Sequence, residues 1–504
     1  MAEKQFILSL DQGTTTSRSF IYDSDFNRTA FQQIEFKQYY PHSGWVEHDP
    51  ETLWESQIQT ARKAISEGQI DIKDIAGIGI TNQRETTLVW NRDTGVPVYP
   101  AIVWQDRRTS AYCKQLKEHG ESENVAQKTG LVIDPYFSAT KIKWILDNVP
   151  QAKEQANQGK LAFGTVDTWL IWKLTKGVKH ITDYSNASRT LVFNIRTLEW
   201  DQELLDLFGI PKSMMPTVVN NSGLLAETDP SIFGKSIPIT GIAGDQQAAL
   251  FGQLCTQPGM AKCTYGTGCF MMLNTGKDII VSTHKMVATI AWKLGEETTY
   301  ALEGSVFVGG ALIQWLRDEL MFIKDAVESE VLAEQAKDSG GVYFVPALTG
   351  LGAPYWDPDA RGAIFGIKRS TTKAELTRAA IESIAFQVND LMEAMSQDLV
   401  NPITQLRVDG GAASNSLLLQ FQSDISTVHL LKPTQLETTS LGVAFFASMG
   451  AKQHTIASIK HKWTIAQEFK PKLDAKLVTA HLGNWKEAVS RSLGWASSTT
   501  EIGE

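Results

Sequence analysis

Short apolar runs of strand length alternate with longer stretches in which apolar residues recur at helical spacing. Residues 6–10 and 75–80 are almost continuously apolar, which predicts buried strands. Between them, Asp49 and Pro50 form a favourable helix start, and the apolar residues that follow repeat every three or four positions. Thr372 starts another helix, with an acidic residue three positions later that completes a capping box. Strands that alternate with helices are typical of α/β domains.

The same local plan occurs twice: a strand, a polar turn rich in Gly and Thr, and a second strand. These segments are residues 6–10, 11–18 and 19–22, and then residues 261–265, 266–268 and 269–273. The chain has 504 residues, whereas single hydrophobic cores stop growing at roughly 250–300 residues. We therefore expect two related α/β domains, residues 1–250 and 251–504, with the boundary near residue 250.

Composition and charge disfavour some classes of protein. The chain is 42% hydrophobic and 20% charged, with a formal net charge of -9. This balance argues against binding nucleic acid or an anionic membrane through bulk charge. The apolar run before Asp11 is too short for a signal peptide or a membrane span, so we expect no membrane insertion and a cytoplasmic location. The four cysteines match neither a zinc nor a redox spacing and predict reduced, structural thiols.

Two familiar phosphate-binding patterns are absent from the sequence. Gly234-Lys235-Ser236 imitates the end of a P-loop, but Asp229 stands where that motif needs its first Gly. We interpret residues 229–236 as a surface loop. No GxGxxG fingerprint occurs, because Gly266-Thr267-Gly268 continues with Cys-Phe-Met. A nicotinamide-dependent dehydrogenase is therefore disfavoured.

Three other turns could approach a nucleotide. Residues 11–18 combine an acid, a Gly, three threonines and an Arg, which are suitable groups for Mg²⁺ and a polyphosphate. The same residues also fit a plain polar hairpin turn, and the sequence alone does not decide between the two. Residues 266–268 form a second flexible turn after a strand, and residues 408–415 a third, which leads into a helix start. Three such turns on separate strands predict a cleft between the halves.

An ordered set of motifs over roughly residues 5–450 resembles the FGGY family of carbohydrate kinases, and in particular its members that phosphorylate glycerol. The motifs are DQGTTTSR at 11–18, GITNQRET at 79–86, AIVWQD at 101–106, GDQQAA at 244–249, TYGTG at 264–268, LEGS at 302–305, QWLRD at 314–318, GLGAPYW at 350–356 and VDGG at 408–411. Any one of them is weak evidence, but their common order is specific.

The resemblance implies a two-domain α/β fold like those of actin and hexokinase, which is ribonuclease H-like, with a deep interdomain cleft. It implies ATP-dependent phosphorylation of glycerol to sn-glycerol 3-phosphate, with ATP and Mg²⁺ as cofactors. Asp245 matches the general base, and Asp11 matches the residue that orients Mg²⁺. The positions matching acceptor contacts are Arg84, Glu85, Trp104, Tyr136, Asp245, Gln246 and Phe270. The positions matching nucleotide contacts are Thr14, Thr15, Thr16, Arg18, Thr267, Gly310, Gln314, Gly411 and Asn415.

The implied partners are glycerol, ATP and ADP, with no nucleic acid and a possible homodimer or homotetramer. The residue types fit a triol, since Arg84 can donate hydrogen bonds, Glu85 can accept them and Gln246 can do both. Simpler interpretations exist for single residues: Arg84 and Glu85 could form an ordinary ion pair, Trp104 could be core, and Asp245 could be a helix N-cap.

Two competing functions remain at this stage. Another kinase of the same family, for xylulose, ribulose or gluconate, would share the phosphate loops and the base. A nucleotide-switched binding protein like actin or a chaperone ATPase would share the core fold. It would hydrolyse ATP slowly, whether or not a polyol is present.

Residues 229–236 also generate a prediction about regulation. Some relatives carry a Gly-rich basic loop here that binds fructose 1,6-bisphosphate, and others carry a His that a sugar phosphotransferase carrier phosphorylates. This chain has only Lys235 as a cation in the segment and no His between Asn221 and Thr240. We expect activity to be unchanged by millimolar fructose 1,6-bisphosphate and by the phosphorylated carrier in steady-state assays. Inhibition by the first or activation by the second would contradict this prediction.

Overall fold

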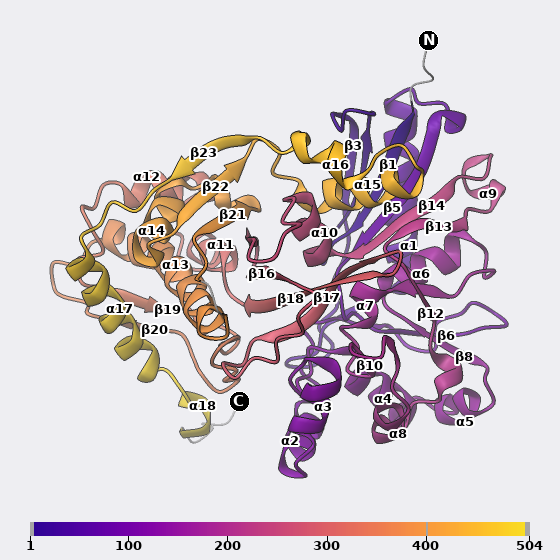
Figure 1. Cartoon of the computed structure of the whole chain (residues 1–504). Helices are drawn as coiled ribbons and strands as arrows, with labels where there is room; N and C mark the ends of the chain where they lie inside the picture. Colours follow the sequence, from indigo (N-terminus) through magenta and orange to yellow (C-terminus); the bar gives the residue numbers. More distant parts are fainter. Residues whose placement is uncertain (1–4, 400–401, 499–504) are drawn as a thin grey trace.

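The computed structural model describes residues 5–399 and 402–498 and contains two large mixed sheets, each with helices against it (Figure 1). The first sheet has the order β13-β14-β5-β1-β2-β3, and the second has the order β17-β18-β16-β15-β21-β22-β23. We call each sheet with the elements packed on it a lobe. The strands of the first sheet are β1 Phe6–Gln12, β2 Thr16–Tyr22, β3 Arg28–Glu35, β5 Ile75–Asn82, β13 Ser222–Glu227 and β14 Pro238–Gly244. Those of the second are β15 Ala261–Tyr265, β16 Cys269–Gly276, β17 Val287–Leu294, β18 Glu297–Val306, β21 Gln405–Asp409, β22 His429–Pro433 and β23 Ile465–Phe469.

Shorter strands and the helices complete the described chain. Two-stranded sheets join β4 Glu47–His48 to β7 Ala101–Ile102, β6 Leu88–Asn91 to β8 Leu161–Gly164, β9 Ile181–Asp183 to β12 Thr217–Val219, β10 Phe193–Asn194 to β11 Glu199–Trp200, and β19 Tyr343–Val345 to β20 Ala363–Phe365. The α-helices are α1 Pro50–Glu67, α2 Ser110–Glu118, α3 Ser122–Thr129, α4 Ser138–Asn148, α5 Ala152–Asn157, α6 Val166–Leu174, α7 Tyr184–Ala187, α8 Gln202–Phe208, α9 Pro230–Phe233, α10 Asp245–Gly252, α11 Gly310–Asp318, α12 Ala326–Ala333, α13 Lys373–Gln397, α14 Ser416–Ser426, α15 Thr438–Gly450, α16 Ile456–Ile459, α17 Ala475–Ser490 and α18 Trp495–Ser498.

The two large sheets share one plan. In the first, β3, β2 and β1 are antiparallel neighbours, β5 and β14 then run parallel to β1, and β13 closes the edge antiparallel. In the second, β18, β16 and β15 are antiparallel neighbours, β21 and β22 are parallel to β15, and β23 closes the edge antiparallel. The two related halves, each opening with a hairpin, are therefore present as predicted.

Local sequence signals account for several element boundaries. Asp49 is the N-cap of α1 and accepts a hydrogen bond from the backbone N–H of Glu51, with Pro50 in the first turn. Thr372 and Glu375 form the predicted capping box of α13. Both helix starts are confirmed.

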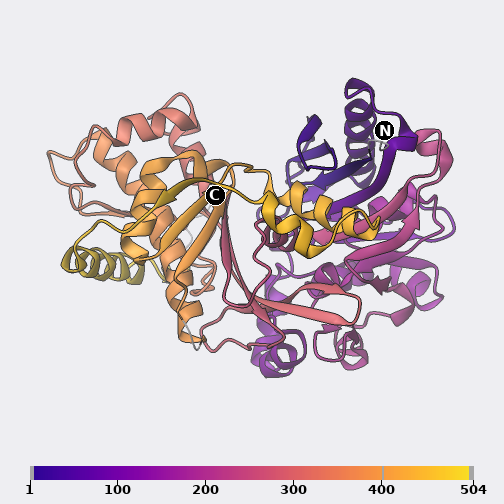
Figure 2. The ribbon, with the colours of Figure 1, turned by 45° about the horizontal axis from the view of Figure 1, so that its top comes forward.

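Helix α15 comes late in the chain, after most strands of the second sheet, but it packs on the first sheet (Figures 1 and 2). It lies against β1, β5, β14 and α10. The helices α10 and α15 approach closely because glycines face each backbone: a Cβ on Gly442 would lie 1.8 Å from the carbonyl oxygen of Ala248, and one on Gly252 would lie 1.9 Å from that of Thr438. The division into residues 1–250 and 251–504 stays a prediction, and α15 shows that the chain returns to the first lobe after it.

The structure also describes the predicted surface loop at residues 229–236 and the four cysteines. The segment 229–236 is not entirely loop, since α9 forms one helical turn there. Asp229 caps this turn by accepting from the backbone N–H of Ser231, and this local pairing was not recognised in the sequence. All four cysteines are buried and free, as predicted. Within the described residues, no helix is long and apolar enough to cross a membrane.

The crossing of α10 and α15 can be tested with Gly442→Ala. The added methyl group has no room against the carbonyl of Ala248, and overpacking of this kind typically costs about 1–3 kcal/mol. We expect a lower thermal unfolding midpoint and lower activity, because α10 begins with Asp245.

Gly483→Ala is the matched control, since Gly483 lies within α17 and a Cβ there would have no neighbour within 4 Å. Alanine at such a site stabilises a helix by roughly 0.5–1 kcal/mol. Equal midpoints for the two variants would show that α10 and α15 do not pack closely.

Candidate active site

The carboxyl ends of parallel strands bring the first set of predicted residues together. In the register of the first sheet, Gln12 of β1 and Gly244 of β14 both pair with Asn82 of β5. The segments that follow these strands carry the threonine turn, Arg84 and Asp245 respectively. Open α/β sheets bind ligands at such strand ends.

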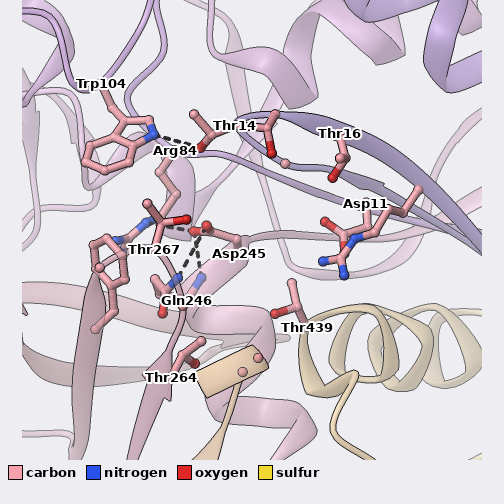
Figure 3. A pocket seen from close by; sticks show the side chains of 18 of the residues that line it. Asp11, Thr14, Thr16, Arg84, Trp104, Asp245, Gln246, Thr264, Thr267 and Thr439 are labelled. Atoms are coloured by element: carbon pink, nitrogen blue, oxygen red, sulfur yellow. Dashed lines mark hydrogen bonds and ion pairs between the residues drawn. The ribbon is translucent and has the colours of Figure 1, made fainter. Parts of the chain in front are cut away.

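The second sheet presents its own strand ends to the same cavity. Thr264 of β15 pairs with Asp409 of β21, and the two glycine turns follow directly. The cleft between the two sets of strand ends has a volume of about 650 Å³. Its lining includes Asp11, Thr14, Thr15, Thr16, Arg18, Arg84, Glu85, Trp104, Tyr136, Asp245, Gln246, Thr267, Phe270 and Gly411. Figure 3 shows residues of both lobes around this cleft.

A second cavity of about 370 Å³ continues the first through Thr267 and Gly411. It is lined by Gly310 and Gln314 of α11 and by Asn415 before α14. Asn415 is the N-cap of α14, and its side-chain oxygen accepts from the backbone N–H of Leu418 at 2.8 Å. Each predicted site residue thus lies in one of two connected cavities.

The threonine turn is fixed by an ion pair across its hairpin. Asp11 and Arg18 are directly paired residues of β1 and β2, and Arg18 Nη2 lies 2.6 Å from Asp11 Oδ2. Arg18 Nη1 also lies 2.9 Å from Glu437, next to α15. Burial raises the pKa of Asp11 above its usual range, and the charge of Arg18 opposes this shift. Thr15 is exposed at the tip of the turn, so its hydroxyl is free to meet a ligand in the cleft.

The residues predicted to contact the acceptor rest on a buried charge network that crosses the lobes. Arg84 donates through Nη1 and Nη2 to the two carboxylate oxygens of Glu303 on β18, at 2.5 and 2.8 Å. Arg189 donates to Glu303 at 3.0 Å and to Glu85 at 2.6 Å. Burial opposes ionisation of Glu303, but Arg189 and Arg84 outweigh it and lower its pKa to about 2. Glu303 is therefore a fixed anion beneath the acceptor residues.

Arg84 and Glu85 do form an ion pair, but as one part of this larger network. Their closest charged atoms are 3.7 Å apart, whereas the short contacts of each go elsewhere. Glu85 also has a positive φ of 60°, which non-glycine residues rarely adopt. The two oppositely charged neighbours therefore make their shortest ionic contacts with different partners, Arg84 with Glu303 and Glu85 with Arg189.

Three aromatic side chains form one wall of the cleft. The ring centroid of Trp104 lies 5.6 Å from that of Tyr136 and 6.0 Å from that of Phe270, and both pairs meet edge to face. The indole Nε1 of Trp104 donates to Thr14 Oγ1 at 2.9 Å, as Figure 3 shows. Trp104 is therefore part of the site and not only core, since it joins the aromatic wall to the threonine turn.

Asp245 lines the first cavity, beside Arg84 and Gln246. It is the first residue of α10, and Gly244 is the N-cap, so the alternative of an N-cap role for Asp245 is wrong. Its Oδ1 receives the backbone N–H of Gln246 at 2.8 Å and lies 3.1 Å from Arg84 Nε. Burial raises the pKa of Asp245, while Arg84 and Lys262 oppose the shift. Its side chain is still 31% exposed, so the carboxylate can meet a ligand.

The residues present fit a magnesium-bound nucleotide. The threonine turn and the glycine turns offer hydroxyl and backbone donors, and Arg18 offers a cation, on opposite sides of one cavity. Within residues 5–399 and 402–498, no group of three or more His, Cys, Asp and Glu is placed to hold a metal by itself. Mg²⁺ usually binds through one or two carboxylates together with substrate phosphates and water, which suits Asp11, a buried carboxylate beside the threonine turn.

Several site residues were missed in the sequence. Glu303, Arg189, Glu437 and Lys262 all contact predicted site residues. Lys262 did carry a signal, because a charged residue inside an otherwise apolar strand is unusual. Glu303 lies within the LEGS motif at 302–305, but the sequence around it, Arg189 and Glu437 does not indicate their partners, which lie more than a hundred positions away.

Two sheets of one plan, with polar turns facing a shared cleft, define a two-lobed α/β protein with a ligand site between its lobes. Residues 6–252 match the N-terminal domain and residues 261–451 the C-terminal domain of the FGGY family of carbohydrate kinases. The chain belongs to this family.

Individual relatives agree with the family assignment. The chain is 55% identical to a glycerol kinase of Parabacteroides distasonis over 98% of this chain and 99% of that one. It is 54% identical to glycerol kinase 2 of Thermotoga maritima over 97% of this chain and 99% of that one. A crystal structure of Plasmodium falciparum glycerol kinase with ADP has a TM-score of 0.90 at 36% identity, covering 97% of this chain and 98% of that one. A gluconate kinase from Lactobacillus acidophilus, at 22% identity and a TM-score of 0.87, shares the fold.

Arg84→Ala tests the acceptor side. Hydrogen bonds to charged groups are typically worth about 1.5–3 kcal/mol, so we expect the KM for glycerol to rise about ten- to a hundredfold. Because Glu303 would keep only one arginine partner, the thermal unfolding midpoint should fall as well. ATP affinity, measured by calorimetry without glycerol, should not change.

Arg62→Ala provides the comparison, since Arg62 is exposed and, among the residues that the structure describes, donates only to the carbonyl of Ile232. That variant should match the wild type in all three measurements. An equal loss of ATP and glycerol affinity in Arg84→Ala would refute the assignment of Arg84 to the acceptor.

Proposed function

We propose that the chain transfers the γ-phosphoryl group of ATP to glycerol, forming sn-glycerol 3-phosphate, with Asp245 as the general base. The main support for this proposal is the position of Asp245, a partly exposed carboxylate between the acceptor residues and the threonine turn. The identity of 54–55% to proteins named glycerol kinase over nearly the whole chain supports the substrate.

The acceptor would lie between the aromatic wall and the charge network. Trp104 and Phe270 offer apolar surface to a carbon backbone, and Arg84 and Glu85 offer a donor and an acceptor to its hydroxyls. A buried polar group left unpaired is costly, so a site of this kind discriminates against an acceptor that lacks one hydroxyl.

Asp245 would take the proton of the attacking hydroxyl. Its Oδ1 is held by Arg84 and the backbone of Gln246, whereas Oδ2 has only the amide of Gln246 at 3.3 Å. Oδ2 is thus the oxygen with capacity for the proton. The raised pKa of Asp245 makes the carboxylate a stronger base than an exposed one.

The polyphosphate would lie between the threonine turn of the first lobe and the Thr267 turn of the second. Arg18 would pair with phosphate oxygens, and Asp11 would orient Mg²⁺ directly or through water. The bound metal would neutralise charge on the transferring group. The second cavity, with Gln314 and Asn415, would hold the nucleoside. A cytoplasmic location and a homo-oligomeric state remain predictions.

Acceptor choice separates this proposal from its competitors. Another kinase of the family would prefer xylulose, ribulose or gluconate, and a nucleotide-switched binding protein would need no polyol. Coupled measurement of ADP release should therefore show turnover that requires glycerol and is far slower with the longer sugars. Glycerol-independent hydrolysis, or faster turnover with a five- or six-carbon acceptor, would contradict the proposal.

Asp245→Asn tests the base itself. The amide keeps the shape but cannot accept the proton, and general-base contributions are typically about 10²–10⁴-fold. We expect a loss of kcat in that range, with ATP binding and the thermal midpoint nearly unchanged. A variant within a few-fold of wild-type kcat would remove Asp245 from this role.

A further inference from the structure

A lysine lies fully buried directly behind the acceptor site. Lys262 is the second residue of β15, is 0% exposed, and stands between the buried Ala261 and Cys263. Taking an ammonium group out of water is costly unless its donors are satisfied. The contacts of Lys262 therefore indicate why a charge is placed here.

The ammonium group of Lys262 donates to three acceptors. They are Oε1 of Gln246, Oγ1 of Thr264 at 2.9 Å and the backbone carbonyl of Phe270 at 3.3 Å. Three acceptors match the three donors of a lysine. All three partner residues line the cleft, whereas Lys262 is covered by them. The lysine thus reaches the site only through other residues.

The contact with Gln246 determines which end of its amide faces the cleft. Because Oε1 is held by Lys262, the remaining group, Nε2, points to the site and donates to Asp245 Oδ2 at 3.3 Å. Gln246 and Asp245 lie side by side in Figure 3. Gln246 consequently acts in the cleft as a donor, and not as both donor and acceptor as expected from its chemistry alone.

The charge of Lys262 also acts on Asp245. The cations that face this carboxylate are Arg84, from the loop after β5, and Lys262, from β15. Both lower its pKa against the effect of burial. Burial lowers the pKa of Lys262, and the charges of Asp409, Asp245 and Glu303 oppose this shift.

We propose that Lys262 is a positioning residue for phosphoryl transfer, which orients the Gln246 amide as a donor and places a cation beside the base Asp245. This inference rests on the proposed function. Lys262 would touch neither acceptor nor nucleotide, but it would set the orientation of the Gln246 amide and the charge beside Asp245.

Lys262→Met removes the charge and the donors while keeping a similar length. We expect kcat/KM for glycerol to fall about ten- to a hundredfold, as for loss of a hydrogen bond to a charged group. Since Asp245 must be ionised to accept a proton, loss of the nearby cation should also move the acid limb of the kcat profile to higher pH. ATP affinity, measured without glycerol, should stay as in the wild type.

Two further variants make the test specific. Lys293→Met is the matched control, because Lys293 is also a buried lysine on the second sheet but donates to the carbonyl of Gly295. It should leave the pH profile unchanged. In a Gln246→Ala background, Lys262→Met should not raise the KM for glycerol further but should still shift the acid limb, since the charge acts independently of the amide.

A folded Lys262→Met protein with wild-type kcat/KM and a wild-type pH profile would overturn the inference. If that variant does not fold, Lys262→Gln replaces it, because its amide can still donate to Gln246 but carries no charge. An unchanged acid limb in Lys262→Gln would likewise overturn the inference. Failure of the wild type to phosphorylate glycerol would instead refute the proposed function, so the two failures are distinguishable.

Discussion

The site depends on one buried interaction, the two-point ion pair between Arg84 and Glu303. Arg84 follows a strand of the first sheet and Glu303 lies on a strand of the second, 219 positions away. Both side chains are almost completely buried, so removing either one would leave a buried charge with fewer partners. The pair therefore fixes the floor of the cleft, and Glu85, Tyr136 and Asp245 take their places around it.

The polar turns of the site are positioned by the ends of parallel strands. In each lobe a hairpin and a parallel neighbour deliver polar turns to the same edge of the sheet. Rigid strands position these short turns more precisely than long loops would. Helix α15 adds a tie between distant parts of the chain, because it packs on the first sheet while the residue before it, Glu437, pairs with Arg18. The phosphate side and the acceptor side are thus each held by groups from both halves of the sequence.

Much of this arrangement could be predicted from local patterns. The hairpins, the helix starting at Pro50 and the turns with Thr14 and Thr267 all carry short-range signals, and the structure has them in the predicted places. Contacts between distant residues could not be predicted in this way. Nothing near Glu303 or Glu437 in the sequence indicates which cation each one meets. Lys262 shows both sides of this limit. A lysine within an otherwise apolar strand can be recognised in the sequence, but its three acceptors cannot.

The central claim is that acceptor and nucleotide react directly with each other in one cleft. Single-turnover transfer from ATP labelled in the γ-phosphate tests it most directly. In the presence of glycerol the label should appear on the terminal hydroxyl as sn-glycerol 3-phosphate, and little label should be released without glycerol. Label released as free phosphate at the same rate with and without glycerol would contradict the account.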